Sequence, residues 1–167
     1  MITNQQIADD LAAHFGEEKA FHFLENYGLL NLETTPEHIL PMLQYLYEHK
    51  IFKFQFLTDL AGIHFPNEKN RELGVIYHLH SLENNIRLII KVYVPINAPN
   101  VPTVTPLYAA ANWMEREAFD FYGIIFVGHP KLERILNVED MDYFPLRKEY
   151  PLEDATRQDK IDQLFGR

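Results

Sequence analysis

Apolar residues recur at helical spacing in two places near the beginning of the chain. Ile7, Leu11 and Phe15 lie four residues apart, which predicts a short amphipathic helix over the first fifteen residues. A second helix is predicted to begin at Pro36, because Thr35 is a favoured N-cap residue and proline is well tolerated at the first helical position. Apolar residues then follow every three or four positions: Ile39, Leu40, Leu43, Leu46 and Tyr47.

A period of two residues, typical of strands, replaces the helical spacing in the middle of the chain. Phe52, Phe54 and Phe56 alternate with polar residues, so these three rings are expected on one face of a strand. Only Leu82–Asn85 separates the next two apolar segments, and this loop is short enough for a hairpin. Strands are therefore predicted at 27–32, 51–61, 73–81 and 86–94.

The stretch from Pro95 to Pro106 contains four prolines, so we expect a stiff, extended connection there. A helix is predicted to follow, with Thr105 as its N-cap, Pro106 at its first position and its end at Gly123. A short strand at Ile124–Val127 comes next. These elements predict an α+β domain over residues 1–130, with a small, largely antiparallel sheet flanked by helices in the order αβαβββαβ.

Neither period lasts beyond this domain, and prolines recur. So few apolar anchors do not support an independent core, yet the segment has too many aromatic residues for a solvated tail. We therefore expect residues 131–167 to form an extended C-terminal arm that docks on partner subunits. Arg134, Arg147 and Arg157 are expected to pair there with carboxylates of the partner.

The predicted helix from Pro106 to Tyr122 has two distinct faces. One is apolar and is expected to meet the core of the domain: Leu107, Ala110, Ala111, Met114, Ala118 and Phe121. A second stripe beside it consists of Ala109, Trp113, Arg116, Glu117 and Asp120. This stripe is either a solvent-facing surface with local ion pairs or a surface that meets other segments or another subunit. Tryptophan and arginine are typical interface anchors and favour the second interpretation.

Composition and motifs narrow the classes of function. The net charge is −9, and the 15 basic residues are scattered among 24 acidic ones, which argues against binding to nucleic acid. The chain has no cysteine, so it lacks the usual ligands of iron–sulfur clusters. We expect no signal peptide, and the most apolar segment, Ile86–Ile96, is too short to span a bilayer. The sequence has no Walker A, G-x-G-x-x-G, G-x-S-x-G or H-E-x-x-H motif.

Three ordered segments in the second half of the chain carry a family signature. They read A-N-W-M-E-R-E-A-F-D-F-Y-G-I from Ala111, F-V-G-H-P-K-L-E-R-I-L from Phe126 and P-L-R-K-E-Y-P-L from Pro145. In order and spacing they closely resemble the 30-kDa subunit family (the C subunits) of respiratory NADH–quinone oxidoreductase, or complex I. The resemblance extends over nearly the whole chain and is densest from 105 to 152.

The resemblance implies that the signature positions form partner interfaces. These positions are Trp113, Glu115, Arg116, Glu117, Asp120, Gly123, Gly128, His129, Pro130, Arg134, Pro145, Leu146, Arg147, Lys148 and Pro151. Two departures put local contacts in question. Tyr143-Phe144 stand where the family often has Gly-His, and His64 stands where an acidic residue often ends the first long strand.

The resemblance further implies a non-catalytic structural and assembly subunit in the peripheral arm of a proton-translocating enzyme. Such a subunit binds no cofactor itself, and FMN, iron–sulfur clusters, NADH and quinone are bound by other subunits. Its expected partners are the quinone-site (D) subunit and the cluster-bearing (B and I) subunits. Its expected place is the cytoplasmic side of the cell membrane, where the complex holds it.

Other functions are compatible with particular residues. The equivalent subunit of a membrane-bound hydrogenase or of another donor-linked complex shares these motifs, and one subunit does not reveal the electron donor or the quinone. A free-standing hydrolase would use His129 with Asp120 or Glu117, although Gly-His-Pro favours a fixed turn in which His129 bonds to backbone or to a carboxylate. His78 and His80 share one strand face and form a possible metal pair, but no third ligand has suitable spacing, so a polar sheet face is preferred.

Overall fold

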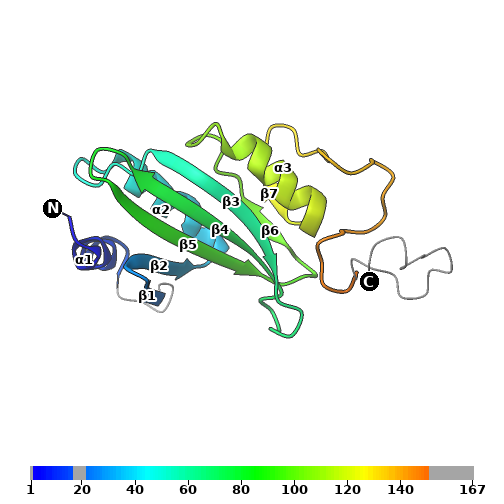
Figure 1. The fold of residues 1–167 in the computed structure, drawn as a ribbon, viewed down its shortest axis with the longest axis horizontal. Coiled ribbons are helices and arrows are strands. Elements are labelled where there is room, and N and C mark those ends of the chain that lie inside the picture. Colours follow the sequence, from blue (N-terminus) through cyan, green and yellow to red (C-terminus); the bar gives the residue numbers. More distant parts are fainter. Residues whose placement is uncertain (1, 17–21, 151–167) are drawn as a thin grey trace, which may run out of the picture.

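The computed structural model describes residues 2–16 and 22–150 (Figure 1). In chain order its elements are α1 (Asn4–Phe15), β1 (His22–Asn26), β2 (Leu29–Thr34), α2 (Pro36–Glu48), β3 (Phe56–His64), β4 (Leu73–Ser81), β5 (Ile86–Val94), β6 (Asn100–Pro102), α3 (Ala111–Tyr122) and β7 (Ile125–Val127). The α+β class is confirmed. The short strands β1 and β6 are additions that the sequence pattern does not predict.

Five strands form one mixed sheet in the order β1-β2-β5-β4-β3. Every neighbouring pair is antiparallel except β2 and β5, which run parallel. A parallel pair needs a long connection, and α2, β3 and β4 supply it. The predicted β4–β5 hairpin is confirmed, with its turn at the four residues that the sequence indicates.

The helices pack on one face of this sheet, which we call the covered face. Alternate strand residues fill it, among them Val75 and Tyr77 on β4 and Ile90 and Val92 on β5, and all four are buried. Figure 1 shows α2 lying behind the strands. Helix α3 packs beside it against β3, where a Cβ added to Gly62 would lie 2.5 Å from the Tyr122 ring.

The two N-terminal helices begin as the sequence predicts and are fixed to each other. Thr3 caps α1 in a reciprocal capping box with Gln6. Pro36 is the first residue of α2. The Tyr45 hydroxyl donates to Asp10 at 2.5 Å, and this bond joins the second helix to the first.

The prediction that three phenylalanine rings share one strand face is wrong. Strand β3 begins only at Phe56, whose side chain is 47% exposed, whereas Phe52 and Phe54 are buried. Lys53 has a φ of 47°, and the Phe54 N–H donates to the Leu46 carbonyl at 3.1 Å. The chain therefore folds back on the end of α2 before the strand starts, and this turn breaks the alternation.

The predicted start of α3 is also wrong. The N–H groups of Leu107 and Tyr108 both bond to the Val104 carbonyl at 3.0 Å, so residues 104–110 form turns, and the helix begins at Ala111. The buried Tyr108 fixes these turns, because its hydroxyl donates to the Phe54 carbonyl at 2.7 Å. No helix of the described residues is long and apolar enough to cross a bilayer.

The long connection and the predicted strand after α3 belong together. Strand β6, inside the proline-rich connection, pairs in parallel with β7 and forms a second, two-stranded sheet. Val101 and Phe126 face each other in this register and are both buried. This small sheet joins the proline-rich connection to the beginning of the second signature segment. From 131 to 150 the described chain contains no helix or strand, and the division into a domain and a docking arm stays a prediction.

Candidate functional site

Helix α3 carries the first signature segment and turns an acidic residue into the core near its beginning. Glu115 has no exposed surface, although the apolar face predicted for this helix does not include it. Ala110, which the prediction assigns to that face, is exposed. The Glu115 carboxylate accepts hydrogen bonds from the Thr103 hydroxyl at 2.5 Å and from the Val104 N–H at 2.7 Å. Burial raises the pKa of Glu115 to about 7, although both hydrogen bonds lower it. This side chain ties the connection after β6 to the helix.

Asp120 is the second buried carboxylate of α3, and it organises the chain that follows β7. It also has no exposed surface. Its two oxygens accept five hydrogen bonds, from the Arg134 guanidinium, the Asn137 side chain and the backbone N–H groups of Ile135, Leu136 and Asn137. Burial alone would raise the pKa of Asp120, but these donors hold it well below its usual range.

Two arginines complete this attachment. Arg134 lies 2.8 Å from Asp120 and also donates to the carbonyls of Met141 and Tyr143. Arg116 donates to the carbonyls of Glu133 and Arg134 at 3.1 Å. The charged stripe of α3 therefore meets another segment of the same chain at Arg116 and Asp120. The prediction that Arg134 pairs with a partner's carboxylate is wrong, because its carboxylate is internal.

The third signature segment is attached to the C-terminal end of α3. Gly123 ends the helix with a φ of 74°, a left-handed conformation that glycine adopts without strain. The Arg147 guanidinium donates to the Tyr122 carbonyl at 2.7 Å, and the Leu146 N–H donates to the Phe121 carbonyl at 3.2 Å. A Cβ at position 123 would lie 2.6 Å from both Arg147 and the Phe144 ring. The shortest described contact of Arg147 is therefore internal, and its pairing with a partner's carboxylate stays a prediction.

Both departures from the family pattern take part in this attachment. Two guanidinium groups lie over the Phe144 ring: the guanidinium carbon of Arg134 is 5.2 Å from the ring centroid, and that of Arg147 is 4.5 Å from it. His64 is buried, and its Nδ1 accepts the Lys148 N–H at 3.0 Å. Burial lowers the pKa of His64, which favours the neutral ring that this bond needs.

The second signature segment contains a fixed turn, as Gly-His-Pro indicates. His129 Nδ1 accepts the Lys131 N–H at 3.0 Å, so Nε2 carries the proton and donates to the Asn112 carbonyl at 3.1 Å. Gly128 has a φ of 87°. Both ring nitrogens of His129 are thus engaged with backbone. Its described bonds include neither Asp120 nor Glu117, which argues against the hydrolase hypothesis.

The remaining signature residues and their neighbours reach the surface. Trp113 is 62% exposed, with the Arg116 guanidinium carbon 5.2 Å from its ring centroid, and Glu117, Pro130 and Lys148 are exposed. Large apolar side chains of the same part of the chain are also exposed, among them the signature residue Leu146: Ile125, Val127, Leu136, Val138 and Leu146. Pro145 is half-buried. Pro151 and Arg157 lie outside the described residues.

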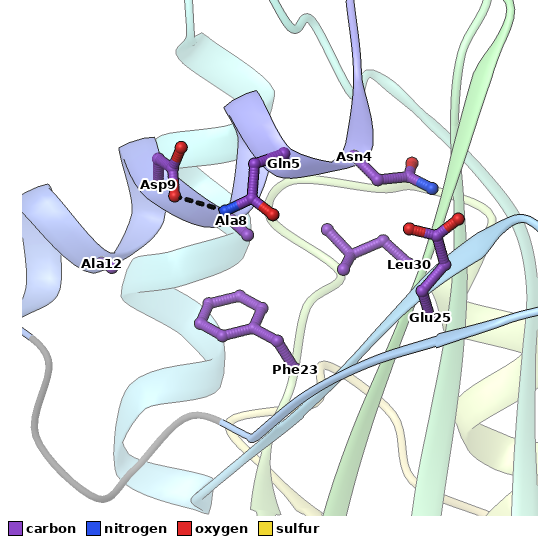
Figure 2. A pocket seen from close by; sticks show the side chains of 8 residues that line it. All are labelled: Asn4, Gln5, Ala8, Asp9, Ala12, Phe23, Glu25 and Leu30. Atoms are coloured by element: carbon purple, nitrogen blue, oxygen red, sulfur yellow. Dashed lines mark hydrogen bonds between the residues drawn. The ribbon is translucent and has the colours of Figure 1, made fainter.

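Three pockets among the described residues offer space for a small molecule. A pocket of about 260 Å³ lies between β3 and α3, with Asp59, Glu117 and Leu146 in its lining. A second, of about 270 Å³, lies between α1 and the β1–β2 hairpin (Figure 2). There Gln5 bonds to Asp9 on the helix, while Phe23 and Leu30 form an apolar side. A third, more open pocket of about 390 Å³ lies at the end of α2, with Tyr45, His49 and Ile51 in its lining. We assign no function to these pockets.

The possible metal pair lies where the sequence predicts. His78 and His80 are both on the sheet face opposite the helices. The described residues contain no group of three or more potential ligands that could hold a metal ion. That the chain binds no cofactor stays a prediction.

Comparison with known proteins agrees with the signature. Residues 32–156 match the family described as "Respiratory-chain NADH dehydrogenase, 30 Kd subunit". A protein named as the C subunit of NADH-quinone oxidoreductase from a Nocardioides strain is 38% identical over 151 residues, which cover 88% of this chain and 60% of that protein. The protein of the same name from Azorhizobium caulinodans is 44% identical over 126 residues, 75% of this chain and 59% of that one. The chain thus spans about 60% of the length of these curated relatives.

Solved structures share the fold. The chain matches "Nqo5 of the trypsin-resistant fragment (1-134)" with a TM-score of 0.65 and 30% identity, over 78% of this chain and all of that one. It also matches a chain of a membrane-bound sulfane sulfur reductase, described as an archaeal respiratory membrane complex. There the TM-score is 0.73 at 22% identity, over 89% of this chain and 85% of the other. This second likeness concerns the fold alone.

Proposed function

Because the chain belongs to the family of 30-kDa subunits of respiratory-chain NADH dehydrogenases, we propose that it is a non-catalytic structural and assembly subunit of a proton-translocating NADH–quinone oxidoreductase. The observation that supports this most is that the titratable signature residues of the chain form internal hydrogen bonds. Glu115, Asp120, His129 and Arg134 are all engaged in internal hydrogen bonds. They shape a surface, and the described residues leave none of these four groups poised as an acid, base or nucleophile.

The surface so shaped is the proposed contact with the other subunits. Trp113, Leu136 and Val138 are each more than 60% exposed, and exposed apolar side chains of this size are typical of protein interfaces. We assign residues 131–150 to the presentation of this surface and 151–167 to docking. The partners are the quinone-site (D) subunit and the cluster-bearing (B and I) subunits. FMN and the clusters belong to other subunits, and the complex holds the chain at the cytoplasmic side of the membrane.

A second candidate is the equivalent subunit of a complex with another electron donor. This candidate is considered because a chain of an archaeal respiratory membrane complex has the same fold. The subunit that binds the donor distinguishes the two candidates. An NADH-binding flavoprotein that co-purifies with the tagged chain supports the first candidate, and its replacement by a hydrogenase-type subunit supports the second.

The experiment is purification of the tagged chain from native membranes, with quinone reductase activity measured in the eluate. We expect the full chain to carry NADH–quinone reductase activity and a chain ending at Tyr150 to lose most of it. A cut after Tyr150 keeps the described contacts of Arg134 and Arg147, whereas a cut after Pro130 removes them. Purification of the full chain alone, or a stoichiometric metal or flavin in the isolated chain, would contradict the proposal.

A further inference from the structure

The sheet has a second face that no described helix covers, and we call it the open face. It is made by the strand residues that alternate with the buried ones: Ile76, His78 and His80 on β4, and Arg87, Ile89 and Lys91 on β5. In Figure 1 this face is turned toward the viewer, and no described element lies in front of β4 and β5.

The open face combines cations with apolar side chains along β5, and two carboxylates flank them, because the register places Asp59 of β3 beside His78 and Glu33 of β2 beside Lys91. Along β5 the order is Arg87, Ile89, Lys91, which is cation, apolar, cation. The cross-strand register places His80 beside Arg87 and His78 beside Ile89. A plain solvated sheet face needs no such isoleucines, and an acidic protein of net charge −9 has few cations to gather here.

These cations have no partner within the described chain. The ion pairs among residues 2–16 and 22–150 involve neither Arg87 nor Lys91. Glu33 lies beside Lys91 in the register, but it is already paired with Arg71 at 2.7 Å. Nε2 of His80 is buried and forms no hydrogen bond within the same residues. The described residues therefore supply no carboxylate partner to Arg87 or Lys91.

We propose that the open face is a docking surface for a segment of another protein that carries carboxylates among apolar side chains. Unpaired cations attract such a segment, and Ile76 and Ile89 give its apolar residues a place to be buried. A second copy of this chain does not fit, because face-to-face contact would bring the same cations together. An anionic membrane does not fit either, because two cations are too few to hold a protein there.

The first test uses the absence of cysteine from the chain. A single Ile89→Cys site on the open face and a single Lys50→Cys site, exposed after the end of α2, are labelled with a thiol reagent in the isolated chain and in the native assembly. We expect labelling at Ile89→Cys to be at least about tenfold slower in the assembly, since burial at an interface excludes the reagent. Labelling at Lys50→Cys is expected to stay the same. Equal rates for Ile89→Cys in both forms would overturn the proposal.

The second test addresses the chemistry of the occupant. A photo-crosslinker attached at Ile89→Cys is expected to join a peptide of another protein with carboxylates next to the link, identified by mass spectrometry. A link to a second copy, or to lipid alone, would overturn the proposal. Reversal of both open-face cations, Arg87→Glu with Lys91→Glu, should lower the assembled fraction about tenfold or more. The matched reversal of Lys50→Glu with Lys69→Glu should leave it unchanged, and equal effects of the two reversals would also overturn the proposal.

The proposal rests on the proposed function only in that the partner is expected within the same assembly. If the tagged chain carries no NADH–quinone reductase activity but its open face is still protected by an acidic segment, the proposed function fails and this inference holds. If the activity co-purifies and the face remains freely labelled, the reverse is true.

Discussion

Glu115 and Asp120 are both fully buried on α3, yet they stand in opposite electrostatic settings. Glu115 accepts two neutral donors, and burial raises its pKa to about 7. Asp120 accepts a guanidinium and four neutral N–H bonds, and its pKa is lowered despite burial. Neither side chain has exposed surface, but Glu115 lies deeper in the protein than Asp120 does. The depth of burial, together with the number and charge of the donors, therefore sets the sign of each pKa shift.

The difference separates two kinds of attachment. The Glu115 side chain on the helix holds the connection that precedes the helix, and ionisation of this carboxylate destabilises the folded state. At Asp120, the carboxylate gathers a following segment that has no helix or strand of its own, and ionisation is what holds it. We call the attachment at the C-terminal end of α3 the joint: ionisation of Asp120 stabilises it, whereas ionisation of Glu115 destabilises the attachment at the beginning of the helix.

The largest expected effect is at Asp120. The change Asp120→Asn keeps the shape but leaves the Arg134 guanidinium without its carboxylate, and breaking one side of a buried ion pair costs about 3–5 kcal/mol. The unfolding free energy of the isolated chain in denaturant measures it. Glu117→Gln, on an exposed position of the same helix, is the control and should change it by less than about 0.5 kcal/mol. If the two variants are equally stable, the contacts of Asp120 with residues 134–137 do not stabilise the fold.

The second prediction concerns pH. The folded pKa of Glu115 is raised to about 7 from 4.5, so its contribution to stability is complete below pH 4.5 and is lost as the pH rises to about 7. Glu115→Gln should therefore match wild type near pH 4.5 and exceed it by roughly 2–3 kcal/mol above pH 7.

Unfolding free energies of both proteins from pH 4.5 to 8 test this, and their difference cancels the contribution of His64. The lowered pKa of His64 acts in the opposite direction, raising stability as the pH approaches 6.5. If the difference in unfolding free energy between the two proteins does not vary with pH, ionisation of Glu115 does not destabilise the fold and the prediction is wrong. Asp120 is separable, because its lowered pKa adds stability that is lost only in more acidic solution, below its ordinary value of 3.8.

The sequence predicts much of the fold but not this contrast. The period of two residues locates β4 and β5, and Thr35-Pro36 locates α2, because these signals are local. Strand β6 is missed because only its pairing with β7 makes it a strand. The helical start at Ala111 is missed because the hydroxyl of Tyr108 holds the preceding turns through a distant carbonyl.

The buried carboxylates are missed for a related reason. Helical periodicity assigns acidic residues to solvent, and nothing local reveals that residues 133–137 return to α3 with donors for Asp120. The family signature lists the correct positions but not their roles. Arg134 and Arg147 resemble interface residues in sequence, and only the fold shows that their main acceptors are internal.

A third prediction sharpens the comparison at the end of the joint. Gly123 and Gly28 have φ values of 74° and 75°, so an alanine is strained to a similar degree at both, by about 1 kcal/mol. A Cβ at Gly28 meets nothing within 4 Å, whereas at Gly123 it would lie 2.6 Å from Arg147 and from Phe144. Gly123→Ala should therefore destabilise the isolated chain by about 1–2 kcal/mol more than Gly28→Ala does. Equal losses would mean that the third signature segment does not pack on the end of α3.

The smallest expected effect on stability is at Trp113. Its ring is 62% exposed and lies 5.2 Å from the Arg116 guanidinium carbon, so Trp113→Ala should lower the unfolding free energy by less than about 1 kcal/mol, because an exposed cation–π contact contributes little. The fraction of chain recovered in the native assembly should nevertheless fall, because a tryptophan of this exposure is a typical interface anchor. Gly123→Ala is the comparison variant, because any loss of assembly in it is expected to result from its lower stability. If Trp113→Ala assembles normally, the exposed side of α3 is not the contact surface. Glu115 and Asp120 then account for the signature of this helix by holding the fold alone.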